Sequence, residues 1–375
     1  MKKVMIFYGS YGGGHLSAAK AVKEYIENNH QDIEIKMIDC VEYVNKILNK
    51  VTTKAYSDMA KIAPKIWGYV YKQSESGIVG RFSIDINKLM AIKLNKLLRE
   101  FKPDYVISTH PFSSQMCAYL KKKGKCYFKL STIMTDFALH DQWIIYQEYV
   151  DLFFVAHDKM KQNLISKGIN ENKIHVTGIP LSNRFLEKYD KEEIFEEFGL
   201  KKDRKTILFF GGGKMGLGKA RTLEILKTLA YNFLNLQIVA ISGKNKEMYE
   251  NFKNIAINTK REDSIKVLEF TDKVPQLMSI SDVVITKPGG LTTTESLASN
   301  LPMIIINPIP GQEEENAEFL ENNNVGIWIK KEDNIQEKFT NIFSNLDKLS
   351  KMKENTRNLS KPHSTKNICK IILEN

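Results

Sequence analysis

The chain has 375 residues, of which 42 % are hydrophobic and 26 % charged, and its formal net charge is +11. This length is enough for about two domains, and the composition excludes a disordered chain. No run of about 18 apolar residues is present, which predicts no membrane-spanning helix, and the apolar stretch at 4–8 is too short for a secretory signal. We therefore expect a cytoplasmic protein.

The first half of the chain alternates short apolar runs with amphipathic segments. It opens with an apolar run at 2–8 that leads into glycines, and a helical pattern follows at 16–29. Further strand-like runs occupy 33–39, 104–110, 129–136 and 151–157. Strands rich in Val, Ile and Phe that alternate with helices are typical of βαβ units and a parallel sheet.

The second half repeats this pattern. An apolar run at 205–210 leads into glycines, and a helical pattern follows at 220–233. Further strand-like runs occupy 236–242, 265–270, 282–290 and 303–308. We expect an α/β protein of two facing Rossmann-like domains with a central cleft, comprising residues 1–180 and 181–375, with the boundary near Gly178 and Pro180.

The basic charge is concentrated in the first domain. Residues 46–102 contain 12 Lys or Arg against 4 Asp or Glu, and residues 43–72 carry an apolar stripe at helical spacing that includes Trp67 and is interrupted by Pro64. A basic amphipathic helix is typical of a segment that lies on an anionic bilayer. A core-packed helix, a solvated lysine-rich face or a site for single-stranded nucleic acid remain alternatives.

Candidate functional residues of the first domain follow its predicted strands, where open parallel sheets bind their ligands. Gly13 and Gly14 form a strand-to-helix turn that permits close approach of a phosphate or sugar. His15 comes next and has the chemistry of a general base, although a lone histidine is often structural. His110 and Asp136 follow two further strands.

The glycines after the first strand of the second domain, Gly211, Gly212 and Gly213, begin a stretch that resembles a P-loop. Gly213 to Lys219 fits GxxxxGK, but Ala220 stands where a P-loop has Ser or Thr. We therefore reject an ATPase and retain phosphate binding by backbone amides.

The stretch 287–316 combines glycines, hydroxyls and carboxylates. Its glycines and threonines open a predicted helix and are suited to phosphate oxygens, whereas the Glu295 carboxylate is suited to ribose hydroxyls. Gln312 and Glu313 are suited to the hydroxyls of a sugar, and Phe270 with the Thr271 backbone to a base, unless Phe270 is a core residue. The predicted UDP-sugar residues here are Phe270, Thr271, Lys287, Gly289, Gly290, Leu291, Thr292, Thr293, Glu295, Gln312, Glu313 and Asn316.

The order of these motifs, YGGGH, STHPF, TDFALHDQW, GGGKMGLGK, EFTD, KPGGLTTTES and PGQEEENA, resembles the family of monogalactosyldiacylglycerol synthase and the processive diacylglycerol glucosyltransferases. This family is related to the lipid-II N-acetylglucosaminyltransferase. The resemblance covers nearly the whole chain. It implies a GT-B fold, a UDP-sugar donor, inversion at the anomeric carbon, no metal or other cofactor, and diacylglycerol as the acceptor.

The resemblance also implies roles for single residues. His15 corresponds to the general base, Glu295 to the ribose-binding glutamate, and Gln312 with Glu313 to the contacts with the donor sugar. The TD…H…W segment, with Asp136, His140 and Trp143, corresponds to the acceptor side. We assign His110, from its place after a strand, and Trp67, from the basic amphipathic stretch, to the same acceptor or lipid side. The last helix, at about 360–375, is expected to pack back on the N-terminal domain.

We therefore predict an inverting hexosyltransferase that is peripheral on the inner face of the cell membrane, uses UDP-glucose or, less favoured, UDP-galactose, and binds no nucleic acid. Three alternatives remain: a UDP-GlcNAc transferase with a polyprenyl-linked acceptor, a UDP-sugar epimerase, and a non-catalytic UDP-regulated protein that binds a membrane or nucleic acid.

Overall fold

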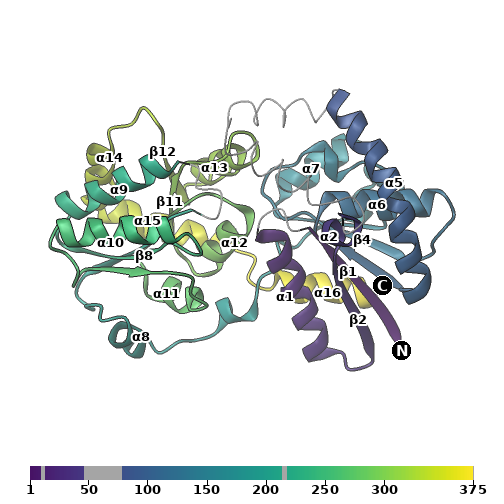
Figure 1. Cartoon of the computed structure of the whole chain (residues 1–375), viewed down its shortest axis with the longest axis horizontal. Coiled ribbons are helices and arrows are strands. Elements are labelled where there is room, and N and C mark those ends of the chain that lie inside the picture. Colours follow the sequence, from purple (N-terminus) through teal and green to yellow (C-terminus); the bar gives the residue numbers. More distant parts are fainter. Residues whose placement is uncertain (10–12, 46–77, 213–217, 375) are drawn as a thin grey trace. The chain divides into compact units, whose positions relative to one another are not determined.

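The computed structural model describes residues 1–9, 13–45, 78–212 and 218–374. Trp67, Gly213 and the stretch 46–77, which includes most of the predicted amphipathic helix, lie outside these ranges. The chain divides into two compact units (Figure 1). The first comprises Met1–Asn183 and Lys361–Asn375, and the second comprises Arg184–Ser360. The sequence counted the C-terminal segment with the second domain but expected its last helix to pack back on the first, and the segment forms part of the first unit.

The first unit contains a six-stranded parallel sheet with the order β2-β1-β3-β4-β5-β6. Its strands are β1 Lys2–Tyr8, β2 Ile33–Asp39, β3 Tyr105–Ser108, β4 Lys129–Ile133, β5 Leu152–Val155 and β6 Ile174–Val176. The first five coincide with apolar runs of the sequence. Strand β6 has only three residues and includes His175, so it has no apolar run that predicts it.

The helices of the first unit are α1 Gly14–Asn29, α2 Cys40–Asn45, α5 Ile78–Phe101, α6 Pro111–Lys122, α7 Asp158–Ser166 and α16 Ser364–Glu374. Short 3-10 helices follow the sheet strands: η1 Asp141–Trp143, η2 Gln147–Tyr149, η3 Glu171–Lys173, and η4 Asn183–Leu186 at the junction of the units. The apolar face of α16 packs with α1 and one face of the sheet (Figure 1). Burial of Ile368, Ile372 and Leu373 there fixes the C-terminal helix to this unit.

The second unit also contains a six-stranded parallel sheet, with the order β12-β11-β10-β7-β8-β9. Its strands are β7 Lys205–Phe210, β8 Leu236–Ile241, β9 Ile265–Leu268, β10 Val283–Thr286, β11 Met303–Ile306 and β12 Gly326–Ile329. Only β12 was not predicted. Gly326 permits close packing at the start of this strand, because a Cβ there would lie 2.9 Å from Ile305 Cδ1.

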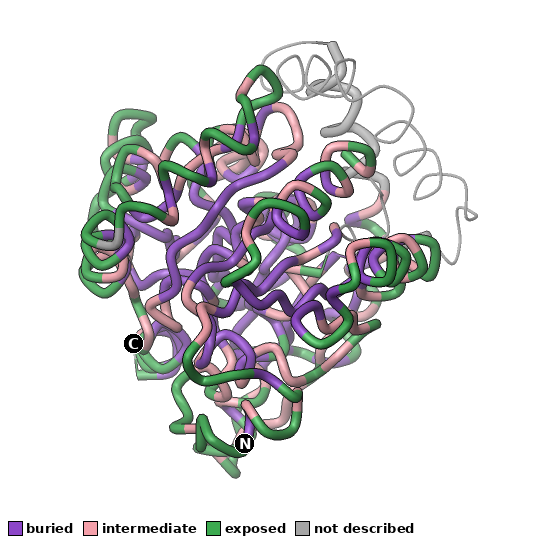
Figure 2. The backbone as a smooth tube through the Cα atoms, turned by 90° about the vertical axis from the view of Figure 1, so that its left-hand side faces the viewer, coloured by how far each residue is buried: buried purple, intermediate pink, exposed green. Residues whose placement is uncertain are grey.

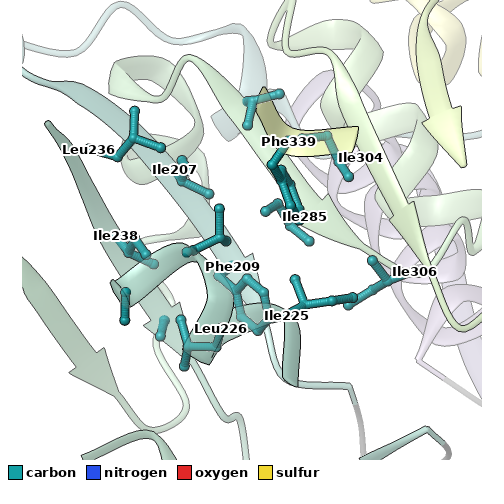
Figure 3. Close-up of a cluster of buried hydrophobic side chains, with 14 of the residues drawn as sticks. Ile207, Phe209, Ile225, Leu226, Leu236, Ile238, Ile285, Ile304, Ile306 and Phe339 are labelled. Atoms are coloured by element: carbon teal, nitrogen blue, oxygen red, sulfur yellow. The ribbon is translucent and has the colours of Figure 1, made fainter. Parts of the chain in front are cut away.

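The helices of the second unit are α8 Lys191–Glu197, α9 Lys219–Asn232, α10 Lys246–Asn258, α11 Val274–Ile280, α12 Gly290–Ala298, α13 Gln312–Asn322, α14 Ile335–Phe343 and α15 Leu346–Leu359. Side chains of β7, β8, β10 and β11 converge with those of α9 and α14 in one buried core (Figure 3). The strands run as buried segments between helices whose outer turns are exposed (Figure 2). None of the helices in the described part of the chain is both long and apolar enough to cross a bilayer.

Each sheet has a point where the strand order reverses. In the first unit β1 lies between β2 and β3, and in the second unit β7 lies between β8 and β10. Loops that leave neighbouring strands in opposite directions create a crevice at the carboxyl edge of such a sheet. The loops at these two points carry His15 and His110 in the first unit, and Gly211, Gly212 and Lys287 in the second.

Candidate active site

His15 lies in the first turn of α1, directly after the turn that follows β1. Its Nδ1 atom is 2.6 Å from the carbonyl oxygen of Thr109, the residue after β3. A carbonyl oxygen can only accept a hydrogen bond, so Nδ1 carries the proton and Nε2 is left with a free lone pair. The Thr109 hydroxyl donates to the carbonyl oxygen of His15 at 2.9 Å, which fixes the backbone of the same residue. The sequence did not point to Thr109, because its partner is distant in the chain.

The ring of His15 lies in an aromatic environment. The His110 ring meets it edge to face with centroids 4.6 Å apart, and the Trp143 ring lies at 6.4 Å. His110 is itself fixed, since its Nδ1 accepts from the backbone N–H of Phe112 at the start of α6. Gly9 makes room for this ring, because a Cβ there would be 2.6 Å from His110 Cδ2. Gly9 was not predicted as a site residue; its place at the end of the first strand was the only signal.

Burial controls the charge of these rings. Desolvation lowers the pKa of His15 to about 4, partly offset by its bond to the Thr109 carbonyl. Desolvation also holds the pKa of His110 well below its usual range, and lowers that of His140 to about 4. All three imidazoles are therefore neutral near pH 7, and His15 presents an uncharged basic nitrogen.

The segment TDFALHDQW follows β4 and brings further predicted residues to this place. Asp136 is buried, Trp143 is fully buried in η1, and the His140 ring packs on Trp143 at 5.8 Å. His157, which sequence reasoning did not single out, holds this segment: its Nε2 bonds the Phe137 carbonyl at 2.9 Å. The structure thus gathers His15, His110, His140 and Trp143 in one unit.

In the second unit the predicted phosphate-binding glycines follow β7. A Cβ on Gly211 would be 2.8 Å from the Phe252 ring, so glycine there permits close packing against α10. Gly212 has a φ of +81°, and the nearest atom to a Cβ there would be Lys287 Cε, at 3.8 Å. Lys287 follows the adjacent strand β10, so a cation and the glycine turn lie together at the reversal point.

Helix α12 begins at Gly290, shortly after Lys287, with Gly289 as its N-cap. Its threonines differ in placement. Thr292 is half-buried, Thr293 is fully buried with a hydroxyl that has no partner in the described residues, and the Thr294 hydroxyl donates to the Gly290 carbonyl at 2.9 Å. Backbone N–H groups of the first turn and Thr292 are therefore the groups of this helix best suited to phosphate oxygens.

Glu295, one turn into α12, is half-buried, and its carboxyl group has no hydrogen-bond or ion-pair partner within the described residues. Desolvation raises its pKa to about 8. A desolvated carboxyl group without a partner is costly in its charged form, which is typical of a group that acquires its partner from a ligand.

The start of α13 holds the remaining predicted carboxylate. Glu313 accepts a hydrogen bond from the Ile309 N–H at 2.6 Å, and attraction to Lys287 counteracts the rise in its pKa that burial causes. Glu314 accepts from the Gly311 N–H at 3.0 Å and caps the helix. Asn316 is fully buried and donates to the Pro288 carbonyl at 2.9 Å, which ties α13 to the loop after β10.

Phe270 lies beyond the end of β9 and is 68 % exposed, with Lys244 5.5 Å from its ring centroid. The reading of Phe270 as a core residue is therefore wrong. Thr271 accepts from the Lys273 N–H through its hydroxyl at 3.1 Å. The other predicted residues lie at helix starts: Gly13 and Gly14 at α1, Leu291 in α12 and Gln312 in α13. No group of three or more potential metal ligands occurs within the described residues.

Two family models match the chain, one in each unit. Residues 15–181 match monogalactosyldiacylglycerol (MGDG) synthase, and residues 190–359 match glycosyl transferases group 1. A processive diacylglycerol beta-glucosyltransferase of Bacillus pumilus (strain SAFR-032) is 31 % identical over 375 residues, which is 100 % of this chain and 95 % of the relative. The chain belongs to the processive diacylglycerol beta-glucosyltransferase family. The enzyme of that name from Bacillus subtilis (strain 168) is 30 % identical, with the same shares covered.

Solved structures place this member of the processive diacylglycerol beta-glucosyltransferase family in the GT-B fold. UDP-GlcNAc 2-epimerase from Neisseria meningitidis, bound to UDP-GlcNAc, has a TM-score of 0.66 at 17 % identity, and Acinetobacter baumannii MurG has 0.63 at 15 %. Both comparisons cover 100 % of each chain. The resemblance stated from the sequence is thereby confirmed: the chain is a glycosyltransferase with the GT-B fold.

Proposed function

We propose that this protein transfers glucose from UDP-glucose to 1,2-diacylglycerol and produces β-glucosyl diacylglycerol and UDP. The observation that carries the proposal is the neutral His15 with a free Nε2, at the strand-reversal point of a chain whose full-length relatives are named for this reaction. The name of those relatives favours glucose over galactose as the sugar.

The first unit activates the acceptor. His15 Nε2 takes the proton of the free diacylglycerol hydroxyl while its oxygen attacks C1 of the sugar. The bond between C1 and the diphosphate oxygen breaks on the opposite side, so the configuration at C1 inverts and the electron pair leaves with UDP. The base is surrounded by the side chains of His110, His140 and Trp143, which exclude water from it. Because the desolvated His15 ring is already neutral, it can accept a proton without first having to release one.

The second unit holds the donor. N–H groups at the start of α12 and the Lys287 ammonium are the positive groups that receive the charge that develops on the diphosphate. Glu295 accepts hydrogen bonds from the ribose hydroxyls. Phe270, with Lys244 near its ring, lies beside the uracil base of UDP. We propose that these groups replace a metal ion, so that the reaction needs none.

Membrane attachment is the part of the proposal that rests on sequence alone. The acceptor is a lipid, and residues 46–102 carry a net charge of +8, from 12 basic and 4 acidic residues. Such a segment attracts anionic phospholipid, and we propose that it holds the enzyme on the inner face of the cell membrane.

The test is product formation by the purified full chain. UDP-glucose, UDP-galactose and UDP-GlcNAc are each supplied with diacylglycerol in vesicles that contain anionic phospholipid, and lipids are separated by chromatography. We expect a β-glucosyl lipid from UDP-glucose, and less product from the other donors. No glycolipid from any donor would refute the proposal.

Three further arms address the alternatives. Transfer of GlcNAc to a polyprenyl-linked sugar acceptor, but not to diacylglycerol, would establish the lipid-II type of reaction. Conversion of a UDP-sugar in the absence of lipid would establish an epimerase. Salt-sensitive binding to oligonucleotides in place of vesicles would establish a nucleic-acid partner.

A further inference from the structure

His15 has a second partner besides the Thr109 carbonyl. The hydroxyl oxygen of Thr135 lies 2.8 Å from the same Nδ1 atom. Thr135 follows β4, whereas Thr109 follows β3, so the ring is held from two neighbouring strands. Thr135 is only 4 % exposed, and this is the only bond of its hydroxyl within the described residues.

The two oxygens compete for one hydrogen. Because the Thr109 carbonyl at 2.6 Å can only accept, the Nδ1 proton points toward it, and the Thr135 oxygen shares this proton as a second acceptor. A histidine that serves as a base is commonly oriented by a carboxylate on its other nitrogen. Here two uncharged oxygens occupy that place.

We propose that Thr135 is a positioning residue for His15: with the Thr109 carbonyl it holds the tautomer whose Nε2 is free and supports the ring when it takes a proton. This inference rests on the proposed role of His15 as the base. It adds Thr135, which lies just before the predicted acceptor-side residue Asp136 and has no role in the proposed function above.

The uncharged orienting pair has a consequence for acid. The titratable groups that face His15 from the described elements are His110, at the start of α6, and His140, before η1. Both are neutral near pH 7, and the two described partners of Nδ1, a carbonyl and a hydroxyl, stabilise the imidazolium through their dipoles. The hydroxyl accepts more strongly from a cationic ring than from a neutral one. Its removal therefore lowers the pKa of His15 further and weakens the base.

The experiment compares three threonine variants of the full chain. Thr135→Val removes the hydroxyl at nearly constant volume, and Thr135→Ser keeps it. Thr132→Val is the matched control, since Thr132 is also buried on β4 but its hydroxyl bonds Ser114 at 2.6 Å and does not contact His15. Glycolipid formation from UDP-glucose and diacylglycerol is followed as a function of pH.

We expect Thr135→Val to lower kcat about tenfold, with the affinity for UDP unchanged, and to move the acid limb of the pH profile downward by about half a unit to one unit. Thr135→Ser and Thr132→Val are expected to stay within about threefold of wild type with an unmoved acid limb. Wild-type kinetics for Thr135→Val, or the same loss in Thr132→Val, would overturn the proposal.

A second measurement does not depend on the reaction. Nitrogen-15 NMR of the His15 ring reports which nitrogen carries the proton, and the pH at which the second proton binds. We expect protonated Nδ1 in wild type and a lower titration midpoint in Thr135→Val. Protonated Nε2 in wild type would refute the orientation itself, whereas correct NMR behaviour without any glycolipid would refute only the proposed function.

Discussion

The two units carry buried or half-buried titratable groups in the loops and helix starts that follow their parallel strands, but the groups differ in kind. The first unit gathers His15, His110 and His140, which burial keeps neutral. The second gathers Lys287, Glu313 and Glu295; desolvation lowers the pKa of the lysine and raises the pKa of both carboxyl groups. This difference is the basis of the proposed division of roles, in which the first site moves a proton and the second binds an anionic ligand.

The two sites also differ in how completely they are formed. His15 is fixed by Thr109 and Thr135, so its geometry is complete without a ligand. Glu295 has no bonding partner among the described residues. A fixed orientation is useful for a catalytic base, because a misoriented ring lowers the rate of proton transfer directly. An unpartnered carboxylate is instead useful for selectivity, since only a ligand with hydroxyls in the right place satisfies it.

The largest expected effect comes from removing the base. His15→Asn keeps a polar side chain in the same position but cannot take the acceptor proton. We expect kcat to fall about 1,000-fold, within the usual range for loss of general base catalysis. Glycolipid formation at saturating UDP-glucose measures this. A fall of less than tenfold in a folded variant would show that another group is the base.

Lys287 tests the anion-binding character of the second unit. Lys287→Met retains length but removes the charge, so we expect about 30-fold weaker binding of UDP and little change for uridine, which has no phosphate. Titration calorimetry with both ligands measures this. Lys273→Met is the control, because this lysine pairs with Glu197 at the surface. Equal losses for uridine and UDP would contradict a role at the diphosphate.

Glu295 gives a pH dependence with a defined sign. Its pKa is about 8 in the folded protein against an ordinary value of 4.5, so the unfolded chain loses this proton at lower pH than the folded one. Its contribution to stability is therefore lost as pH rises from about 4.5 through 8. Glu295→Gln removes this loss, and we expect its Tm to match wild type at pH 5 and to exceed it increasingly toward pH 9.

The same variant should bind UDP about tenfold more weakly, because the ribose loses a charged acceptor. The gain in Tm and the loss in affinity together distinguish a binding carboxylate from a structural one. A Tm difference independent of pH would contradict the raised pKa of Glu295.

The smallest expected effect is at Phe270. Its ring is 68 % exposed, so Phe270→Ala should leave the free energy of unfolding within about 0.5 kcal/mol of wild type. Loss of stacking should weaken UDP binding about fivefold. Exposed Tyr231 offers a control as Tyr231→Ala. Unchanged UDP affinity in Phe270→Ala would remove this ring from the donor site.

Most of the fold followed from apolar periodicity. Ten of the twelve strands in the described residues coincide with predicted runs; β6 has only three residues, with His175 in its middle, and β12 begins with Gly326, so neither stood out as an apolar run. The residues named as candidates were those whose chemistry is visible in a local motif, such as His15 and Glu295. Thr109, Thr135, Gly9 and His157 were missed because their roles consist of contacts across distant segments: Thr135 meets His15 from 120 positions away. Which threonines of α12 are buried and which is partly exposed could also not be predicted from the sequence, because it depends on how the helix packs.

The most direct test of the division between the units is the affinity of His15→Asn for UDP, measured by calorimetry beside its turnover. If the first unit moves the proton and the second binds the donor, UDP binds this variant within about twofold of wild type while glycolipid formation is nearly abolished. A loss of UDP affinity that parallels the loss of turnover would show that His15 belongs to the donor site, and would contradict this account.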